Sequence, residues 1–290
     1  MKELVIISGK GGTGKTLITA SFSILKKDSV MADCDVDTPN LHLLLKPHIM
    51  SEEDYYGPKV AVLNKSKCIM CGKCMEKNLC RFHAIGKGEM PVFNSFYCRG
   101  CKVCTIVCPA GAITLEERRS GKIYKGYVED MPVIYGQLSP GYLGSGKMVV
   151  QIKNIARNVA LKEGKELIII DSSAGLGCNV ISALSNSDVA LIVTEPTLSG
   201  ISDLIRILDV TDYFQIPVSV CINKCGINRE NEKKIADYCN EEGIKISGKL
   251  SFDMELAMNN KGQIPLISSP ESNLSKELIN LWHEVSLLLK

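Results

Sequence analysis

The glycine-rich stretch SGKGGTGKT, Ser8 to Thr16, constrains the fold more than any other part of the chain. It follows the apolar run LVII and precedes a segment of helical periodicity, and it fits the pattern G-x-x-x-x-G-K-[ST]. In such a loop, glycines let backbone N–H groups close around phosphates, Lys15 meets the β and γ charges, and the Thr16 hydroxyl ligates Mg²⁺. With strand, loop and helix in this order, the motif indicates a phosphate-binding site rather than a purely structural turn.

The rest of the chain outside residues ~60 to ~118 shows apolar runs that alternate with helical segments, which is typical of a parallel sheet covered on both faces. At 290 residues and 45% hydrophobic content, the chain suits one large α/β domain with an addition. The expected strands are Leu4–Ser8, Ser29–Asp33, Pro132–Gly136, Glu166–Asp171, Val189–Thr194 and Pro217–Asn223. The expected helices are Thr16–Lys26, Lys147–Lys162, Ser199–Asp209 and Asn231–Glu242.

Charge and hydropathy exclude two classes of partner. The formal net charge is only +2, which gives no reason to expect a nucleic-acid partner. No apolar run approaches the ~20 residues needed to span a bilayer, and the N-terminus enters a strand without a basic, apolar leader. We therefore expect a cytoplasmic protein without stable membrane insertion, in which the 13 cysteines suggest a metal site rather than disulfides.

Eight cysteines form two blocks that repeat one another, CIMCGKCMEKNLC and CRGCKVCTIVCP. The second is the bacterial ferredoxin run C-x2-C-x2-C-x3-C-P, in which three close thiolates hold one 4Fe-4S cluster and the fourth reaches the other cluster. This crossing rule predicts two quartets: Cys68, Cys71, Cys74 and Cys108 form the first, and Cys98, Cys101, Cys104 and Cys80 form the second. Zinc also binds thiolates at such spacing, but two blocks in register are more typical of cubane clusters. The other cysteines are scattered and are expected to be core or incidental residues: Cys34, Cys178, Cys221, Cys225 and Cys239.

The second lysine of the phosphate loop, Lys10, suggests a family. KGGTGKT resembles the deviant phosphate loop of the MinD, nitrogenase iron protein and Mrp group of ATPases. ADCDVDTPNLHLLL resembles the first switch of this group, DSSAGLGCNV its second switch, and INK at Ile222 to Lys224 its adenine-contacting turn. With its cysteine blocks, the chain resembles MinD-superfamily P-loop ATPases with an inserted double-cluster ferredoxin domain.

This resemblance implies a mostly parallel, doubly wound P-loop sheet built from residues 1–59 and 119–290. A bacterial-type ferredoxin domain with two 4Fe-4S clusters would occupy residues 60–118. ATP or ADP with Mg²⁺ would contact Gly11, Gly12, Thr13, Gly14, Lys15, Thr16, Leu17 and Asn223, with Thr16 as a Mg²⁺ ligand.

The catalytic residues that the resemblance implies are Lys10, Lys15, Asp35 and Asp171. Lys10 would cross a two-fold interface to the phosphates of a partner subunit, although a solvated loop lysine is the alternative. Asp35 would orient the attacking water, and Asp171 would hold Mg²⁺ or its water shell. Asp33 is as compatible with a cap or turn residue as with a catalytic role.

Two features depart from the family. Only Cys178 and the widely spaced Cys221 and Cys225 follow the second switch, which argues against a cluster bridging two subunits. The C-terminal segment LSKELINLWHEVSLLLK has few cations to meet anionic lipid, so it is expected to pack on the core rather than to bind a membrane.

The favoured function is an ATPase whose nucleotide-switched homodimer is coupled to its own two clusters. It would act in electron transfer or metallocofactor assembly, with an unidentified redox or assembly protein as partner. The alternative is a MinD-like positioning or scaffolding ATPase whose clusters are a redox sensor or docking module, and fold alone does not separate the two. A plain electron carrier with a degenerate nucleotide fold is disfavoured because Lys15, Thr16, Asp35 and Asp171 are all present.

Overall fold

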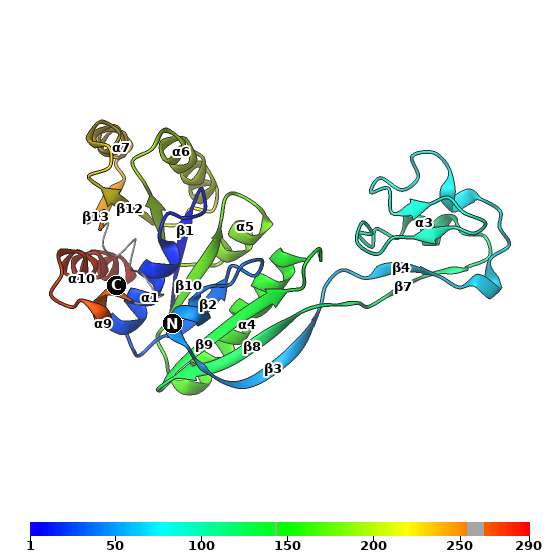
Figure 1. Cartoon of the computed structure of the whole chain (residues 1–290), viewed down its shortest axis with the longest axis horizontal. Helices are drawn as coiled ribbons and strands as arrows, with labels where there is room; N and C mark the ends of the chain where they lie inside the picture. Colours follow the sequence, from blue (N-terminus) through cyan, green and yellow to red (C-terminus); the bar gives the residue numbers. More distant parts are fainter. Residues whose placement is uncertain (143, 254–263) are drawn as a thin grey trace. The chain divides into compact units, whose positions relative to one another are not determined.

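The computed structural model describes residues 1–142, 144–253 and 264–290, and it divides into two compact units (Figure 1). Unit 1 comprises Met1–Glu52, Ile123–Gln137 and Ser145–Lys290. Unit 2 comprises Glu53–Lys122 and Leu138–Gly144. The segment 60–118, predicted as an insertion, lies within unit 2, which also takes in residues on either side of it.

The described residues form a nine-stranded sheet in the order β13-β12-β11-β1-β10-β2-β9-β8-β3. Every neighbouring pair from β13 to β9 is parallel, as the alternating apolar runs and helices predict. These strands are β1 (Lys2–Ser8), β2 (Val30–Cys34), β9 (Met131–Leu138), β10 (Leu167–Ala174), β11 (Val189–Thr194), β12 (Val218–Cys225) and β13 (Lys245–Ser251). The edge strands are β8 (Arg119–Val128) and β3 (His48–Tyr56). The six expected strands are all present, and the α/β fold with a mostly parallel sheet is confirmed.

Helices cover both faces of this sheet. Figure 1 shows α1, α9 and α10 on one side of the central strands and α4 and α5 on the other. Leu4 and Ile6 of β1 join the core formed with α1 and α10, while the intervening Val5 is also fully buried. The helices of unit 1 are α1 (Lys15–Leu25), α2 (Leu41–Leu45), α4 (Ser145–Glu163), α5 (Cys178–Leu184), α6 (Leu198–Tyr213), α7 (Arg229–Glu241), α9 (Pro265–Ser268) and α10 (Asn273–Ser286), with the 3₁₀ turn η3 (Leu287–Leu289) after the last.

The last helix packs on the core, as its sequence predicts. Leu278 and Leu281 of α10 are fully buried. The ring of Trp282 lies 5.0 Å from that of Phe22 in α1. Within the described ranges, no helix combines the length and apolar character needed to cross a bilayer.

Unit 2 is built from short pieces. Strand β4 (Val60–Leu63) pairs antiparallel with β7 (Ile113–Glu116), and β5 (Ile85–Gly86) pairs antiparallel with β6 (Val92–Phe93). The remaining elements are α3 (Val103–Val107) and the 3₁₀ turns η1 (Lys65–Lys67) and η2 (Lys73–Met75). One buried cluster in this unit consists of Ala61, Cys74 and Ile113, with partly buried cysteines packed against them.

Candidate functional site

The predicted nucleotide residues meet at one edge of the sheet because the carboxyl ends of its parallel strands lie there. The phosphate loop follows β1 and leads directly into α1, whose N-cap is Gly14. Gly14 has a φ of 96°, and a Cβ on it would lie 2.3 Å from the side-chain nitrogen of Asn223. The left-handed backbone therefore favours glycine here, and a Cβ would also displace the Asn223 amide. Gly11 and Gly12 are exposed, whereas Thr13 is buried.

The Lys15 side chain points toward the carboxyl end of β1. Its ammonium donates to the Ser8 hydroxyl at 2.7 Å and is nearly buried. Burial lowers the pKa of Lys15, and the charges of Asp171 and Asp35 oppose that shift. The structure thus brings Lys15, Asp35 and Asp171 into one electrostatic group, as expected for a phosphate and metal site.

Asp171 has the features of a metal ligand. Its Oδ1 accepts from the Thr19 hydroxyl at 3.3 Å, and its buried Oδ2 has no hydrogen-bond partner. Burial raises the pKa of Asp171 to about 6, opposed by a hydrogen bond from Thr16 and by the charge of Lys15. The unpaired Asp171 Oδ2 and the hydroxyl of Thr16, in the first turn of α1, are oxygen donors of the kind that Mg²⁺ prefers, so these residues fit the ion.

Asp33 and Asp35 differ in role. Asp33 is fully buried and accepts from the backbone N–H groups of Asp35 and Leu41, both at 3.0 Å. Burial and the charge of Asp171 raise its pKa well above the usual value. Both oxygens of Asp33 are therefore used to shape the loop, which matches the turn-forming interpretation. Asp35 is only partly buried, and one of its oxygens accepts from the Thr38 hydroxyl at 3.3 Å.

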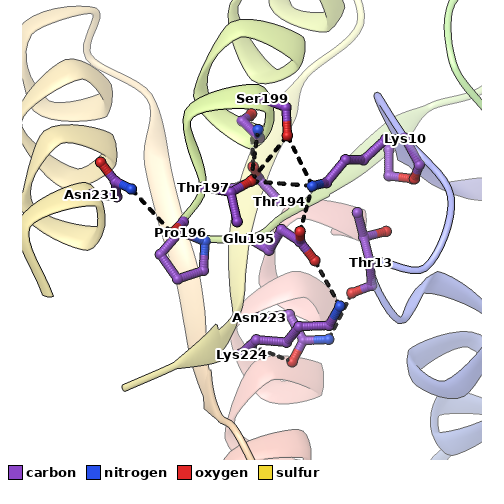
Figure 2. A network of polar contacts seen from close by, with 12 residues as sticks. Lys10, Thr13, Thr194, Glu195, Pro196, Thr197, Ser199, Asn223, Lys224 and Asn231 are labelled. Carbon is purple, nitrogen blue, oxygen red and sulfur yellow. Dashed lines mark hydrogen bonds and ion pairs between the residues drawn. The ribbon is translucent and has the colours of Figure 1, made fainter. Parts of the chain in front are cut away.

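Lys10 does not join this group. Its ammonium lies 2.5 Å from Glu195 Oε1 and donates to the hydroxyls of Thr197 at 3.1 Å and Ser199 at 3.0 Å (Figure 2). Glu195 and Thr197 belong to the turn between β11 and α6 of the same chain, and Ser199 lies in the first turn of α6. Lys10 is thus ion-paired within its own chain, and its action across a dimer interface stays a prediction.

Glu195 is the site residue that the motifs do not mark. Its second oxygen lies 2.7 Å from the ammonium of Lys224, so one carboxylate joins Lys10 of the phosphate loop to Lys224 at the end of β12 (Figure 2). Burial raises its pKa, but the hydrogen bonds from Lys10 and Lys224 outweigh this and leave the pKa lowered. The signal in the sequence was indirect: a second loop lysine needs an anion, and Glu195 directly follows an apolar strand.

Asn223 lies beside the phosphate loop. Its side-chain nitrogen donates to the Thr13 carbonyl at 2.7 Å, and its side-chain oxygen accepts from the Lys224 backbone N–H at 2.8 Å. In this conformation the amide links the end of β12 to the loop. Contact of Asn223 with adenine stays a prediction.

The eight clustered thiols lie in unit 2. Burial raises the pKa of the Cys74 thiol, and the thiols that add to this shift are those of Cys108, Cys68 and Cys71. Burial likewise raises the pKa of Cys104 to about 11, with added effects of Cys98, Cys101 and Cys80. For Cys74 and for Cys104, the thiols that raise the pKa are the other three members of the predicted quartet, and cluster binding by these quartets stays a prediction.

The surroundings of the second quartet form a cavity. All four of its thiols line this cavity together with apolar side chains that include Leu79, Phe82 and Phe93. Backbone N–H groups donate at 3.3 Å to the sulfurs of Cys80, Cys98 and Cys108, from Ala84, Ala61 and Ala112 respectively. No set of three or more His, Cys, Asp or Glu side chains in the described residues is placed to hold a metal ion.

The five scattered cysteines divide by burial. Cys34, Cys221 and Cys239 are fully buried, as expected of core residues. Cys225 is partly buried and Cys178 is exposed.

Comparison with known proteins identifies a family that this chain matches. Residues 4–266 match the family described as the CobQ/CobB/MinD/ParA nucleotide binding domain. An uncharacterized protein of Methanocaldococcus jannaschii is 34% identical over 98% of this chain and 96% of its own length. A shorter stretch of 74 residues, 25% of this chain, is 39% identical to 12% of the indolepyruvate oxidoreductase subunit IorA of Methanothermobacter marburgensis.

Solved structures share the fold. The cell division ATPase MinD of Pyrococcus furiosus superposes with a TM-score of 0.59 at 19% identity, covering 99% of both chains. MinD of Pyrococcus horikoshii, complexed with Mg-ADP, gives a TM-score of 0.58 at 19% identity and covers 99% of this chain and 96% of its own.

Proposed function

Because this chain belongs to the CobQ/CobB/MinD/ParA nucleotide-binding family, it is a P-loop ATPase, and we propose that its ATP-switched homodimer is coupled to two 4Fe-4S clusters in the same chain. The coupled process is electron transfer or metallocofactor assembly in the cytoplasm, with a redox or assembly protein as partner. The partial similarity to an oxidoreductase subunit supports a redox role.

The observation that carries the proposal is the crossed grouping of thiols in unit 2. Cys80 of the first block lines one cavity with Cys98, Cys101 and Cys104 of the second. Cys108 of the second block is among the thiols that raise the pKa of Cys74 in the first. Backbone N–H bonds to sulfur and an apolar lining are features that tune cluster potentials. When bound, the clusters would supply one-electron transfer.

The ATPase roles follow from the sheet edge. Lys15 would neutralise the β and γ phosphates, while Thr16 and Asp171 would hold Mg²⁺. Asp35, half-buried and near Lys15, would orient the attacking water. Lys10 would act across the dimer interface, where it adds positive charge at the partner's phosphates only in the closed state.

Anaerobic purification tests the coupling. We expect about eight irons and eight sulfides per chain, together with a broad visible band that dithionite bleaches. Stoichiometric zinc in their place would refute the cluster proposal. ATP-dependent reduction of a partner or transfer of clusters would support the coupling. Nucleotide-dependent binding of a Cys68→Ser/Cys98→Ser variant to membranes or DNA would instead indicate a positioning ATPase.

A further inference from the structure

The Lys10 ammonium has every hydrogen-bond partner it needs within its own chain. A lysine ammonium carries three N–H donors. Glu195, Thr197 and Ser199 supply three acceptors, all within 3.1 Å (Figure 2). To reach the phosphates of another subunit, Lys10 must therefore give up interactions that it already has.

The acceptor turn is fixed independently of Lys10. The Thr197 hydroxyl accepts from the Gly200 backbone N–H at 3.0 Å and so caps helix α6. Gly200 in turn packs closely on Glu195, since a Cβ on it would lie 2.3 Å from the Glu195 carbonyl. When Lys10 leaves this turn, it therefore gives up acceptors whose positions do not depend on it.

Lys224 makes the departure of Lys10 feasible. Glu195 is only 7% exposed, and a buried carboxylate left without any partner is strongly destabilised. The Lys224 ammonium lies 2.7 Å from its second oxygen and stays behind when Lys10 leaves. The carboxylate is thus arranged to release one cation while keeping another.

We infer that Glu195 is a positioning residue that holds Lys10 in its own subunit and thereby sets the ATP concentration at which two chains associate. This inference rests on the proposed function, in which Lys10 acts on the phosphates of the partner subunit. The Lys10–Glu195 ion pair is made only in the monomer, so it favours the monomer over the dimer. The free energy of ATP binding must compensate for its loss in both chains.

The first test is Glu195→Gln, which keeps the shape of the side chain but removes its charge. Sedimentation velocity with a non-hydrolysable ATP analogue should show half-maximal dimerisation at an about tenfold lower nucleotide concentration than the wild type requires. The affinity of the dilute monomer for a fluorescent ADP analogue should not change. A purely structural Glu195 would instead weaken both binding and dimerisation when replaced.

Two further variants should shift the nucleotide concentration needed for dimerisation in opposite directions. Ser199→Ala removes one hydroxyl acceptor and should shift the threshold in the same direction by a smaller factor. Lys224→Met leaves Lys10 as the only cation on Glu195, so it should hold Lys10 more tightly and raise the threshold. A threshold that falls in Lys224→Met, or stays unchanged in Glu195→Gln, would overturn the inference.

The wild type and Lys10→Ala separate failure of this inference from failure of the proposed function. If the wild type does not dimerise with ATP, or Lys10→Ala dimerises normally, the trans role of Lys10 is wrong and the positioning role falls with it. If Lys10→Ala abolishes dimerisation while Glu195→Gln leaves the threshold unchanged, only the inference about Glu195 is wrong.

Discussion

The two lysines of the phosphate loop point to different partners, so their replacements should have different effects. Lys15→Ala should weaken ATP binding by about 10- to 100-fold, because the ammonium proposed to neutralise the β and γ phosphates is lost. Lys10→Ala should keep most of the ATP affinity but lose dimerisation and hydrolysis together. Fluorescent-nucleotide titration, sedimentation and phosphate release separate these outcomes, and a monomeric Lys10→Ala chain that hydrolyses ATP at the normal rate would refute the trans role.

Asp35 offers a test of catalysis apart from binding. Asp35→Ala should bind ATP and form a long-lived dimer, while hydrolysis slows by about 100-fold or more, because the water loses its orienting carboxylate. Asp37→Ala is the matched control, since Asp37 is an exposed carboxylate two residues further along the same loop. Loss of ATP binding in Asp35→Ala would assign Asp35 to the structure of the loop.

Asp171 should lower the stability of the protein in the pH range where it is charged. Its pKa is raised from 3.8 to about 6 in the folded chain, so folding opposes ionisation. The penalty is fully present above pH 6, shrinks as the pH falls below 6, and is absent below pH 3.8. Asp171→Asn without Mg²⁺ should therefore raise the free energy of unfolding by about 2 kcal/mol at pH 8 and by less at pH 5.

Urea unfolding at several pH values measures this effect. Asp130→Asn removes an exposed carboxylate and controls for the change in net charge. A gain in stability that did not depend on pH would show that the burial of charge is not its cause.

At the residue scale, the sequence predicts those parts of the site that a local motif defines. Lys15, Thr16 and Gly14 stand at fixed spacing because one loop must wrap one phosphate chain. Glu195 has no such signature, since its partners Lys10 and Lys224 are brought to it by the sheet. The contact of Glu195 with these two lysines could therefore be recognised only once the strand order was known.

At the scale of elements, buried parallel strands were predictable and edge strands were not. The six predicted strands read as apolar runs because helices cover both faces of the sheet. Strand β3, HIMSEEDYY, is exposed except for Tyr55, and β13, KISGKLS, alternates with lysine and serine. Neither presents the continuous apolar signal of a central strand.

In the proposed ligation, the two cysteine blocks exchange one cluster ligand, and this exchange can be tested. Cys108→Ser should impair the cluster held by the first block, although Cys108 lies in the second. Anaerobic electron paramagnetic resonance of a Cys108→Ser chain should show the signal of the second quartet and lose that of the first, with exposed Cys178→Ser as the control. To assign the signals, Cys71→Ser should affect the same cluster as Cys108→Ser, whereas Cys101→Ser should affect the other. Loss of the Cys101 cluster in Cys108→Ser would contradict crossed ligation.

At the scale of the whole molecule, the two units differ in what stabilises them. Unit 1 has an extensive core that spans its sheet and helices, whereas unit 2 buries fewer apolar side chains, three of which are the alanines Ala61, Ala84 and Ala112. A unit with so little buried apolar surface depends on cross-links or metal for stability. The thiols of unit 2 are free, so bound clusters would have to supply that support.

Removal of iron should therefore affect the units unequally. After anaerobic chelation, limited proteolysis should cut within residues 53–122, while the resistant fragments of unit 1 still bind nucleotide. Mass spectrometry of the fragments locates the cuts, and untreated protein is the control. Equal resistance before and after chelation would show that unit 2 folds without clusters.

The order of strands in the sheet also bears on synthesis. Strand β1 is made first, yet its neighbours are β10 and β11, which begin at Leu167 and Val189. Unit 2 needs the chain only as far as Gly144. At about 5–20 residues per second, a ribosome would expose all eight clustered thiols seconds before the strands that flank the phosphate loop emerge. The thiols would thus be open to oxidation, and to the delivery of iron, before the nascent chain has any site for ATP.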